Sequence, residues 1–440
     1  MSALLDQARM VVALAKKKGA GDARATATLS REVEVVWRDG RVEKVSEATT
    51  QGVSVNLYVD GRYGSVMTSD LRPEALERFL EESIALTRTL AKDPYRALPD
   101  PKRYEGRAKV DLQIDDPAYE SVTAEVRRKR AKEMEEGARS ASGASAIISV
   151  EANVSDTRTR SAMVSSNGFE GERYETELWQ DASVTCKDKD GRRPEESDGA
   201  GERFFASLPP PAETGKKAAE RAIGTLGAAK IKSAVVPLVI ENRAGARMIR
   251  SLLAAMTGRA LQQKQSFLEG KLGKAVASKH LTLIDDPLLL RGLASRLYDG
   301  DGFAAQKRVI FDKGVLKTFF IDDYYARKLK VDPTTGGSTN LIFDGGKHML
   351  AEHLAAVKEG ILVTGFLGGN SNSTTGDFSA GFQGYRITGG KQAEPVAEMN
   401  LSGNLMTFFD HLSAVGADPW PYAAIRTPTL VFDGVQVAGL

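Results

Sequence analysis

Long runs of alternating apolar and polar residues, separated by two-residue turn signals, constrain the fold of this chain more than any other feature. Residues 23–37 alternate with a period of two, which is typical of a strand with one buried face. Asp39-Gly40 and Asp60-Gly61 follow as hairpin signals, and Asn167-Gly168 repeats the pattern later in the chain. Strands joined by such short turns are antiparallel neighbours. The sequence therefore predicts antiparallel sheets, with 42–46, 52–59 and 63–68 as further strands of one meander.

Helical periodicity appears before and after these strands. A helix opens the chain and ends near Gly19, and residues 72–90 predict a second helix with Pro73 in its first turn. Residues 118–139 predict a charged helix that contains Arg127-Arg128-Lys129-Arg130. Acidic residues follow this tetrad within a turn, so we interpret it as a solvated helix face rather than a nucleic-acid site.

The length of the chain, 440 residues, exceeds what one hydrophobic core usually supports, which predicts two domains. The character of the sequence changes near residue 230, where the apolar strand 234–240 and a long helix over 243–268 are expected. We predict an α+β fold with domains at 1–230 and 231–440. The first packs helices on an antiparallel sheet, and the second is rich in antiparallel strands.

The charge balance excludes several classes of function. Sixty basic and 58 acidic residues give a net charge of +2, so no global field favours nucleic acid or anionic lipid.

The start has no basic segment followed by an apolar one, and no run of about 18 apolar residues occurs, which predicts a cytoplasmic protein without a membrane partner. Cys186 is the single cysteine, which excludes an internal disulfide, and its alternating surroundings predict a buried or half-buried strand position.

Residues 360–382 form the most unusual stretch. An apolar strand enters a segment rich in glycine, and six side chains from Asn370 to Thr375 can form hydrogen bonds but cannot ionise. This chemistry suits a neutral, extended ligand such as a peptide backbone. A long solvated hairpin loop over 368–378 is the alternative.

Candidate catalytic groups are few. His348, Glu352 and His353 superficially resemble a zinc-peptidase helix, but positions five apart in a regular helix point about 140° away from each other. We therefore interpret them as the exposed first turn of a helix over 349–359. No Gly-x-Ser-x-Gly elbow, Walker loop or dinucleotide-binding loop is present.

Several blocks of the second half, taken in their order and spacing, resemble the TldD/PmbA family. They read QQKQSFL at 262–268, IDDP at 284–287, YDGDG at 298–302, GVLK at 314–317, YARKL at 325–329, Thr339-Asn340, the stretch 360–382 and MNLSGN at 399–404. The glycine-rich strands and helices of the first half are similar to the family's first domain.

This resemblance implies a cytoplasmic zinc metallopeptidase of two related subunits, once described as a modulator of DNA gyrase, that admits unfolded peptides into a closed chamber. The TldD subunit has a His-Glu-x-x-x-His helix and a late cysteine, and the PmbA/TldE subunit lacks both. Here Arg250 and Ser251 stand near the His-Glu positions, and residues 423–440 contain no cysteine. The resemblance therefore implies a subunit with no catalytic residue and no metal or other cofactor of its own, with zinc expected in a TldD-like partner.

Within this interpretation, the unusual stretch binds an extended peptide or lines its channel. The alternatives are a stand-alone homodimeric peptide-binding or regulatory protein, and a stretch whose glycine and asparagine serve only subunit packing. The candidate peptide-binding or channel-lining residues are Thr364, Gly365, Phe366, Gly368, Gly369, Asn370, Ser371, Asn372, Thr374, Thr375, Gly376 and Phe378.

Overall fold

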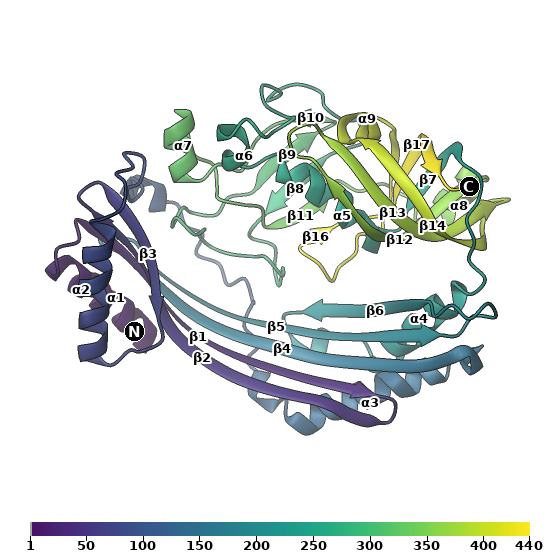
Figure 1. Ribbon diagram of the computed structural model, residues 1–440, viewed down its shortest axis with the longest axis horizontal. Coiled ribbons are helices and arrows are strands. Elements are labelled where there is room, and N and C mark those ends of the chain that lie inside the picture. Colours follow the sequence, from purple (N-terminus) through teal and green to yellow (C-terminus); the bar gives the residue numbers. More distant parts are fainter. Residues whose placement is uncertain (1) are drawn as a thin grey trace.

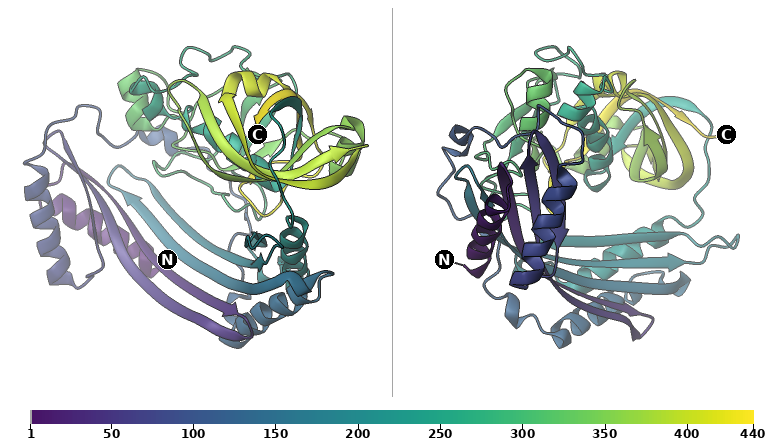
Figure 2. Two further views of the ribbon diagram at one scale, coloured as in Figure 1. Left: turned by 45° about the vertical axis from the view of Figure 1, so that its right-hand side comes forward. Right: turned by 60° about the vertical axis from the view of Figure 1, so that its left-hand side comes forward.

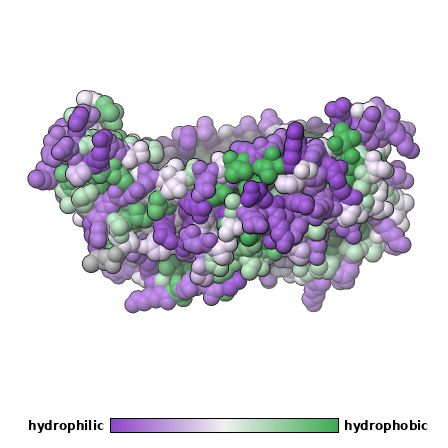
Figure 3. Space-filling model, turned by 90° about the horizontal axis from the view of Figure 1, so that it is seen from below, coloured by the Kyte–Doolittle hydropathy of each residue, from purple (hydrophilic) through white to green (hydrophobic). Residues whose placement is uncertain are grey.

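The structure, a computed structural model, describes residues 2–440 and combines three β-sheets with nine α-helices over that range. The mixed α+β fold class predicted from the sequence is confirmed. The long strands of the first sheet curve beneath the C-terminal half of the chain (Figure 1). Seen from below, the molecule is mostly hydrophilic, with apolar residues in small, separate patches (Figure 3).

The first sheet is an antiparallel meander in the order β3-β2-β1-β4-β5-β6. Asp39, Gly40, Asp60 and Gly61 all have positive φ, as the predicted two-residue hairpin turns require. The strands predicted at 42–46 and 52–59 are one continuous strand, β2. The strands are β1 (Asp22–Arg38), β2 (Arg41–Val59), β3 (Arg62–Thr68), β4 (Ile147–Ser165), β5 (Glu170–Cys186) and β6 (Glu195–Glu202).

Helices cover one face of this sheet because alternate residues of its strands are apolar. Ala25 and Val35 of β1 have the same parity, and both are fully buried. Ala25 belongs to the core that includes α1, and α3 also contacts β1. The opposite face of β1 is polar except for Val36, and the sheet bows so that its hollow side is turned toward the C-terminal half (Figure 2). The helices are α1 (Ala3–Lys17), α2 (Pro73–Thr87), α3 (Ala124–Arg139) and α4 (Pro211–Gly224).

Helix α3 differs from the prediction in two ways. It begins at Ala124, because the Thr123 side chain caps it, rather than at 118. Arg127 is buried rather than solvated, since it forms two hydrogen bonds of 2.6 and 2.9 Å with the buried carboxylate of Asp156. Within the basic tetrad, Arg127 thus faces the interior, whereas Arg128 and Lys129 are exposed.

The C-terminal half contains two sheets with a shared core. Leu238, Phe311, Phe382 and Phe432 belong to one apolar cluster that joins them. Most neighbours are antiparallel, but β7 pairs with β12 and β11 pairs with β16 in parallel. The strands are β7 (Ala234–Ile240), β8 (Leu283–Asp286), β9 (Arg308–Asp312), β10 (Val315–Leu316), β11 (Asn340–Phe343), β12 (Gly360–Ser371), β13 (Asp377–Thr388), β14 (Lys391–Asn404), β15 (Leu412–Val415), β16 (Ile425–Arg426) and β17 (Leu430–Ala438).

The long helix predicted over 243–268 is wrong, because the chain leaves the helical path after α5. The Gly258 amide donates to the Phe320 carbonyl at 2.8 Å, and the Phe320 amide donates to Met256 at 2.9 Å. Thr257 then caps the short helix α6. The helices of this half are α5 (Asn242–Ala254), α6 (Gly258–Gln262), α7 (Asp323–Leu329), α8 (Leu350–Val357) and α9 (Leu405–Asp410).

Candidate functional site

A cleft lies where the edge strand β6 and helix α4 of the first half meet β12 and α5 of the second half. It consists of two adjoining cavities of about 490 and 420 Å³. Glu196, Arg243 and Thr364 line both cavities, so the two spaces share one wall. Residues far apart in the sequence therefore form a single site.

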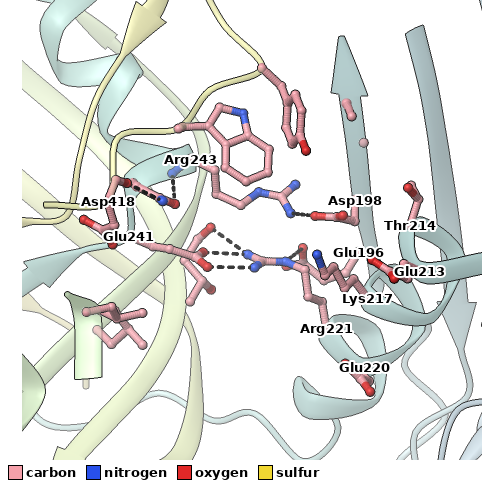
Figure 4. Close-up of a pocket in the computed structure, with 18 of the residues that line it drawn as sticks. Glu196, Asp198, Glu213, Thr214, Lys217, Glu220, Arg221, Glu241, Arg243 and Asp418 are labelled. Carbon is pink, nitrogen blue, oxygen red and sulfur yellow. Dashed lines mark hydrogen bonds and ion pairs between the residues drawn. The ribbon is translucent and has the colours of Figure 1, made fainter. Parts of the chain in front are cut away.

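An ion-pair network spans the larger cavity and connects the two halves (Figure 4). Arg221 of α4 donates to both carboxylate oxygens of Glu241, at 2.9 and 2.8 Å, and to the Thr364 carbonyl at 3.2 Å. Its Nε lies 3.7 Å from the Glu196 carboxylate. Arg243 of α5 donates to Asp198 at 2.6 Å. The network holds β6 and α4 against the start of α5.

Burial strongly affects the charges of this network. It raises the pKa of the Glu196 and Asp198 carboxyls, and the nearby arginines oppose that shift. Burial also lowers the pKa of Arg243, and the positive charge of the neighbouring Arg221 lowers it further. For Arg221, burial opposes charge, but the hydrogen bonds to Glu241 leave its pKa raised. The arginines and carboxylates thus depend on each other for their charged state.

The edge of β12 opens into the smaller cavity. β7 pairs with β12 only over Ile361–Val363, because β7 ends at Ile240 and the chain turns into α5. The Glu241 amide makes the last contact, with the Val363 carbonyl at 2.9 Å. From Thr364 to Leu367, no other strand of the described chain pairs with β12 on this side, and these residues line the cavity.

Helix α5 forms another wall of the smaller cavity, and it presents three arginines there. Arg243, Arg247 and Arg250 stand at positions i, i+4 and i+7, which lie within about 60° of one another around a helix. Arg247 donates to the Gly368 carbonyl, and its guanidinium lies 5.8 Å from the Phe366 ring centre. The wall therefore carries three guanidinium groups, of which Arg243 is paired with Asp198.

The structure divides the predicted peptide-binding stretch between two places. Thr364, Gly365 and Phe366 line the cleft. Five others, with Gln265, line a separate hollow of about 620 Å³ at the tip of the β12–β13 hairpin. These five are Asn370, Ser371, Asn372, Thr374 and Phe378.

The loop predicted over 368–378 is shorter than expected. β12 continues to Ser371 through a bulge at Gly368 and Gly369, both with positive φ, and the connecting turn ends at Gly376. Thr375 lies in this turn, where its hydroxyl donates to Asp377 at 2.7 Å. A bulge bends a strand without ending its pairing, so Gly368 and Gly369 belong to a strand rather than to the predicted loop.

The cleft network was missed by sequence reasoning, although part of it left a signal. Glu196 and Asp198 are two residues apart, so they share one face of a strand, and burial on that face implies charged partners. Nothing local in the sequence indicates that Arg221, Glu241 and Arg243 would be those partners.

The histidine pair also differs from its prediction. His348 precedes α8, so helical spacing does not apply, and the His348 and His353 rings pack edge to face with centroids 5.9 Å apart. His353 is buried rather than exposed, and its Nε2 has no hydrogen-bond partner in the described structure. Within residues 2–440, no three histidine, cysteine, aspartate or glutamate side chains gather in a way that could hold a metal ion.

Three family models match most of the chain. They describe PmbA/TldA metallopeptidase domain 1, central domain and C-terminal domain, and they match residues 27–87, 117–226 and 233–439. The Metalloprotease PmbA of Escherichia coli O157:H7 is 25% identical over 409 residues, 92% of this chain and 90% of that protein. A Metalloprotease PmbA homolog of Haemophilus influenzae is 26% identical, over 97% of this chain and 94% of its own length.

Solved structures show the same architecture over nearly the whole chain. A candidate modulator of DNA gyrase from Bacteroides thetaiotaomicron has a TM-score of 0.96 and 39% identity, and the match covers 99% of this chain and 98% of that one. TldE from Thermococcus kodakarensis shares the fold, with a TM-score of 0.85, 21% identity and coverage of 98% and 100%. Fold and matched models together define a metallopeptidase-related protein. The chain belongs to the PmbA/TldD family.

In the described residues, no helix is both long and apolar enough to cross a membrane.

Proposed function

We propose that this chain is the metal-free, PmbA/TldE-like subunit of a TldD/TldE-type zinc metallopeptidase. A TldD-like partner supplies the zinc, and this chain supplies chamber wall and peptide-binding surface. The likeness to PmbA relatives and to the TldE fold supports this proposal. The cleft side of α5 supports it as well, because arginine is only a hydrogen-bond donor, whereas zinc takes cysteine, histidine or carboxylate ligands.

The open edge of β12 is the observation that carries the peptide-binding part of the proposal. An extended peptide can add as a further strand to an unpaired edge through main-chain hydrogen bonds. Thr364, Gly365 and Phe366 form an edge without a neighbouring strand inside the cleft, although the Thr364 carbonyl already accepts a hydrogen bond from Arg221. The polar hollow at the hairpin tip, lined by uncharged side chains and by Asp377, would continue this surface as channel lining.

Zinc content and peptide cleavage test the subunit assignment. The purified full-length chain should hold less than stoichiometric zinc by elemental analysis and should not cleave an unstructured peptide. Mixing it with a TldD-like subunit should give a complex that cleaves the peptide. Stoichiometric zinc together with cleavage by the isolated chain would refute the assignment. A stable self-dimer that does not bind a TldD-like subunit would instead favour the stand-alone homodimeric binding protein.

Substitution at the hairpin tip separates channel lining from subunit packing. Asn370→Ala is the cleaner variant, because Asn372 also accepts a hydrogen bond of 2.8 Å from the Thr374 amide within the turn. Channel lining predicts weaker peptide binding with assembly intact for Asn370→Ala and Asn372→Ala. Loss of assembly would support packing instead. Gln51→Ala, an exposed amide on β2, is the matched control.

A further inference from the structure

Two of the three arginines on α5 have no carboxylate partner. Arg243 is neutralised by Asp198 at 2.6 Å. Within residues 2–440, the Arg247 guanidinium interacts with two neutral groups, the Gly368 carbonyl and the Phe366 ring, and forms no ion pair. Arg250 is exposed, and no ion pair or hydrogen bond joins its side chain to another described residue. The smaller cavity thus presents two guanidinium groups whose charge the described chain leaves uncompensated.

The acidic residues of the same cavity are already engaged. Glu196 accepts a hydrogen bond from Gln383 and lies 3.7 Å from the Arg221 guanidinium. Glu195 accepts a hydrogen bond from the Thr185 hydroxyl at 2.8 Å. Neither carboxylate lies within ion-pair distance of Arg247 or Arg250 in the described structure. An incoming carboxylate would therefore meet donors that no acid of this chain already holds.

We propose that Arg247 and Arg250 bind a carboxylate of an extended peptide lying along the open edge of β12. The planar guanidinium fork matches a carboxylate, and charge-assisted hydrogen bonds are stronger than neutral ones. The two residues are three apart, a rise of about 4.5 Å along the helix, so both reach the same part of the cavity. The inference rests on the proposed peptide-binding function and adds a preference for acidic peptides or free C-termini.

Three fluorescent peptides of one extended sequence distinguish the sources of the carboxylate. One carries a central aspartate and an amidated C-terminus, the second replaces aspartate with asparagine, and the third has asparagine with a free C-terminus. Fluorescence anisotropy with the full-length chain measures each affinity. We expect the aspartate peptide, the free C-terminus or both to bind about tenfold more tightly than the neutral peptide.

Arg250→Gln should remove this preference, because glutamine lacks the positive charge and the guanidinium fork that bind a carboxylate. The fold should be kept, since Arg250 is exposed and its side chain forms no hydrogen bond or ion pair with another residue of the described range. Arg259→Gln, an exposed arginine of α6 outside the cavity, is the control and should keep the preference. If the neutral peptide binds as tightly as both acidic ones, the carboxylate site is overturned while the peptide-binding function stands. If none of the three binds, the peptide-binding function falls and the carboxylate site with it.

Discussion

Replacing Arg127 with methionine should destabilise the first sheet, because this arginine compensates a buried carboxylate. The side chains of Arg127 and Asp156 are only 2% and 1% exposed. Arg127 donates to both oxygens of Asp156, at 2.6 and 2.9 Å, and to the Val122 carbonyl. Without it, the Tyr119 hydroxyl, at 2.6 Å, is the one hydrogen-bond donor that the described residues leave to the Asp156 carboxylate. Removing one member of a buried ion pair costs about 3 to 5 kcal/mol, so we expect a loss of that size in the free energy of unfolding.

Urea denaturation of the full-length chain, followed by circular dichroism, measures this loss. Lys129→Met is the matched control, because Lys129 lies on the same helix with its side chain 74% exposed, and its stability should equal that of the unaltered chain. Adding Asp156→Leu to Arg127→Met should restore part of the stability, since no unpaired charge then remains buried. The reasoning is refuted if Arg127→Met unfolds at the unaltered urea midpoint, or if the double variant is less stable than the single one.

Three further predictions concern single positions. Burial lowers the pKa of His353 below its usual 6.5, so as the pH falls below 6.5 the unfolded chain takes up the proton first and stability decreases. His353→Leu should reduce this decrease in urea midpoints between about pH 7.5 and about pH 5.5, one unit either side of 6.5. An equal decrease in both proteins would contradict the assignment. Gly215→Ala should lower the free energy of unfolding by about 1 to 3 kcal/mol, because its Cβ would lie 1.7 Å from the Met134 carbonyl oxygen. Gly300→Ala, whose Cβ meets no atom within 4 Å, should keep the unaltered thermal midpoint, and equal midpoints for both alanine variants would refute the packing argument. Cys186 is 0% exposed and burial raises the pKa of its thiol, so a thiol reagent should label it only in urea, and fast labelling of the folded chain would contradict its burial.

Sequence reasoning succeeded where structure depends on neighbours along the chain. Alternation and the Asp39-Gly40 and Asp60-Gly61 turns predicted the β1–β3 meander, because hairpin pairing is set by a turn of two residues. The same alternation predicted a buried or half-buried strand position for Cys186, which is buried at the end of β5. The family blocks, read in order, also predicted the family to which the chain belongs.

The candidate site was predictable only in part, because a pattern does not reveal which distant segment an element meets. The candidate residues of β12 and the hairpin tip were singled out by composition, but the end of β7 at Ile240 decides which edge of β12 is open. The peptide-binding role of these residues stays a prediction. Likewise, Phe320 interrupts the predicted helix over 243–268 by pairing across more than 50 residues of sequence.

The sequence by itself determined the strands and turns of the β1–β3 meander and the apolar face of β1, since these follow from local backbone preferences and from periodicity. Tertiary structure decided which charges are paired. Arg221 meets Glu241, Arg243 meets Asp198, and Arg127 meets Asp156, while Arg250 meets no acid of the described chain. Coulomb attraction and desolvation depend on distance in space rather than along the chain, so only the packed fold distinguishes a neutralised arginine from one available to a ligand.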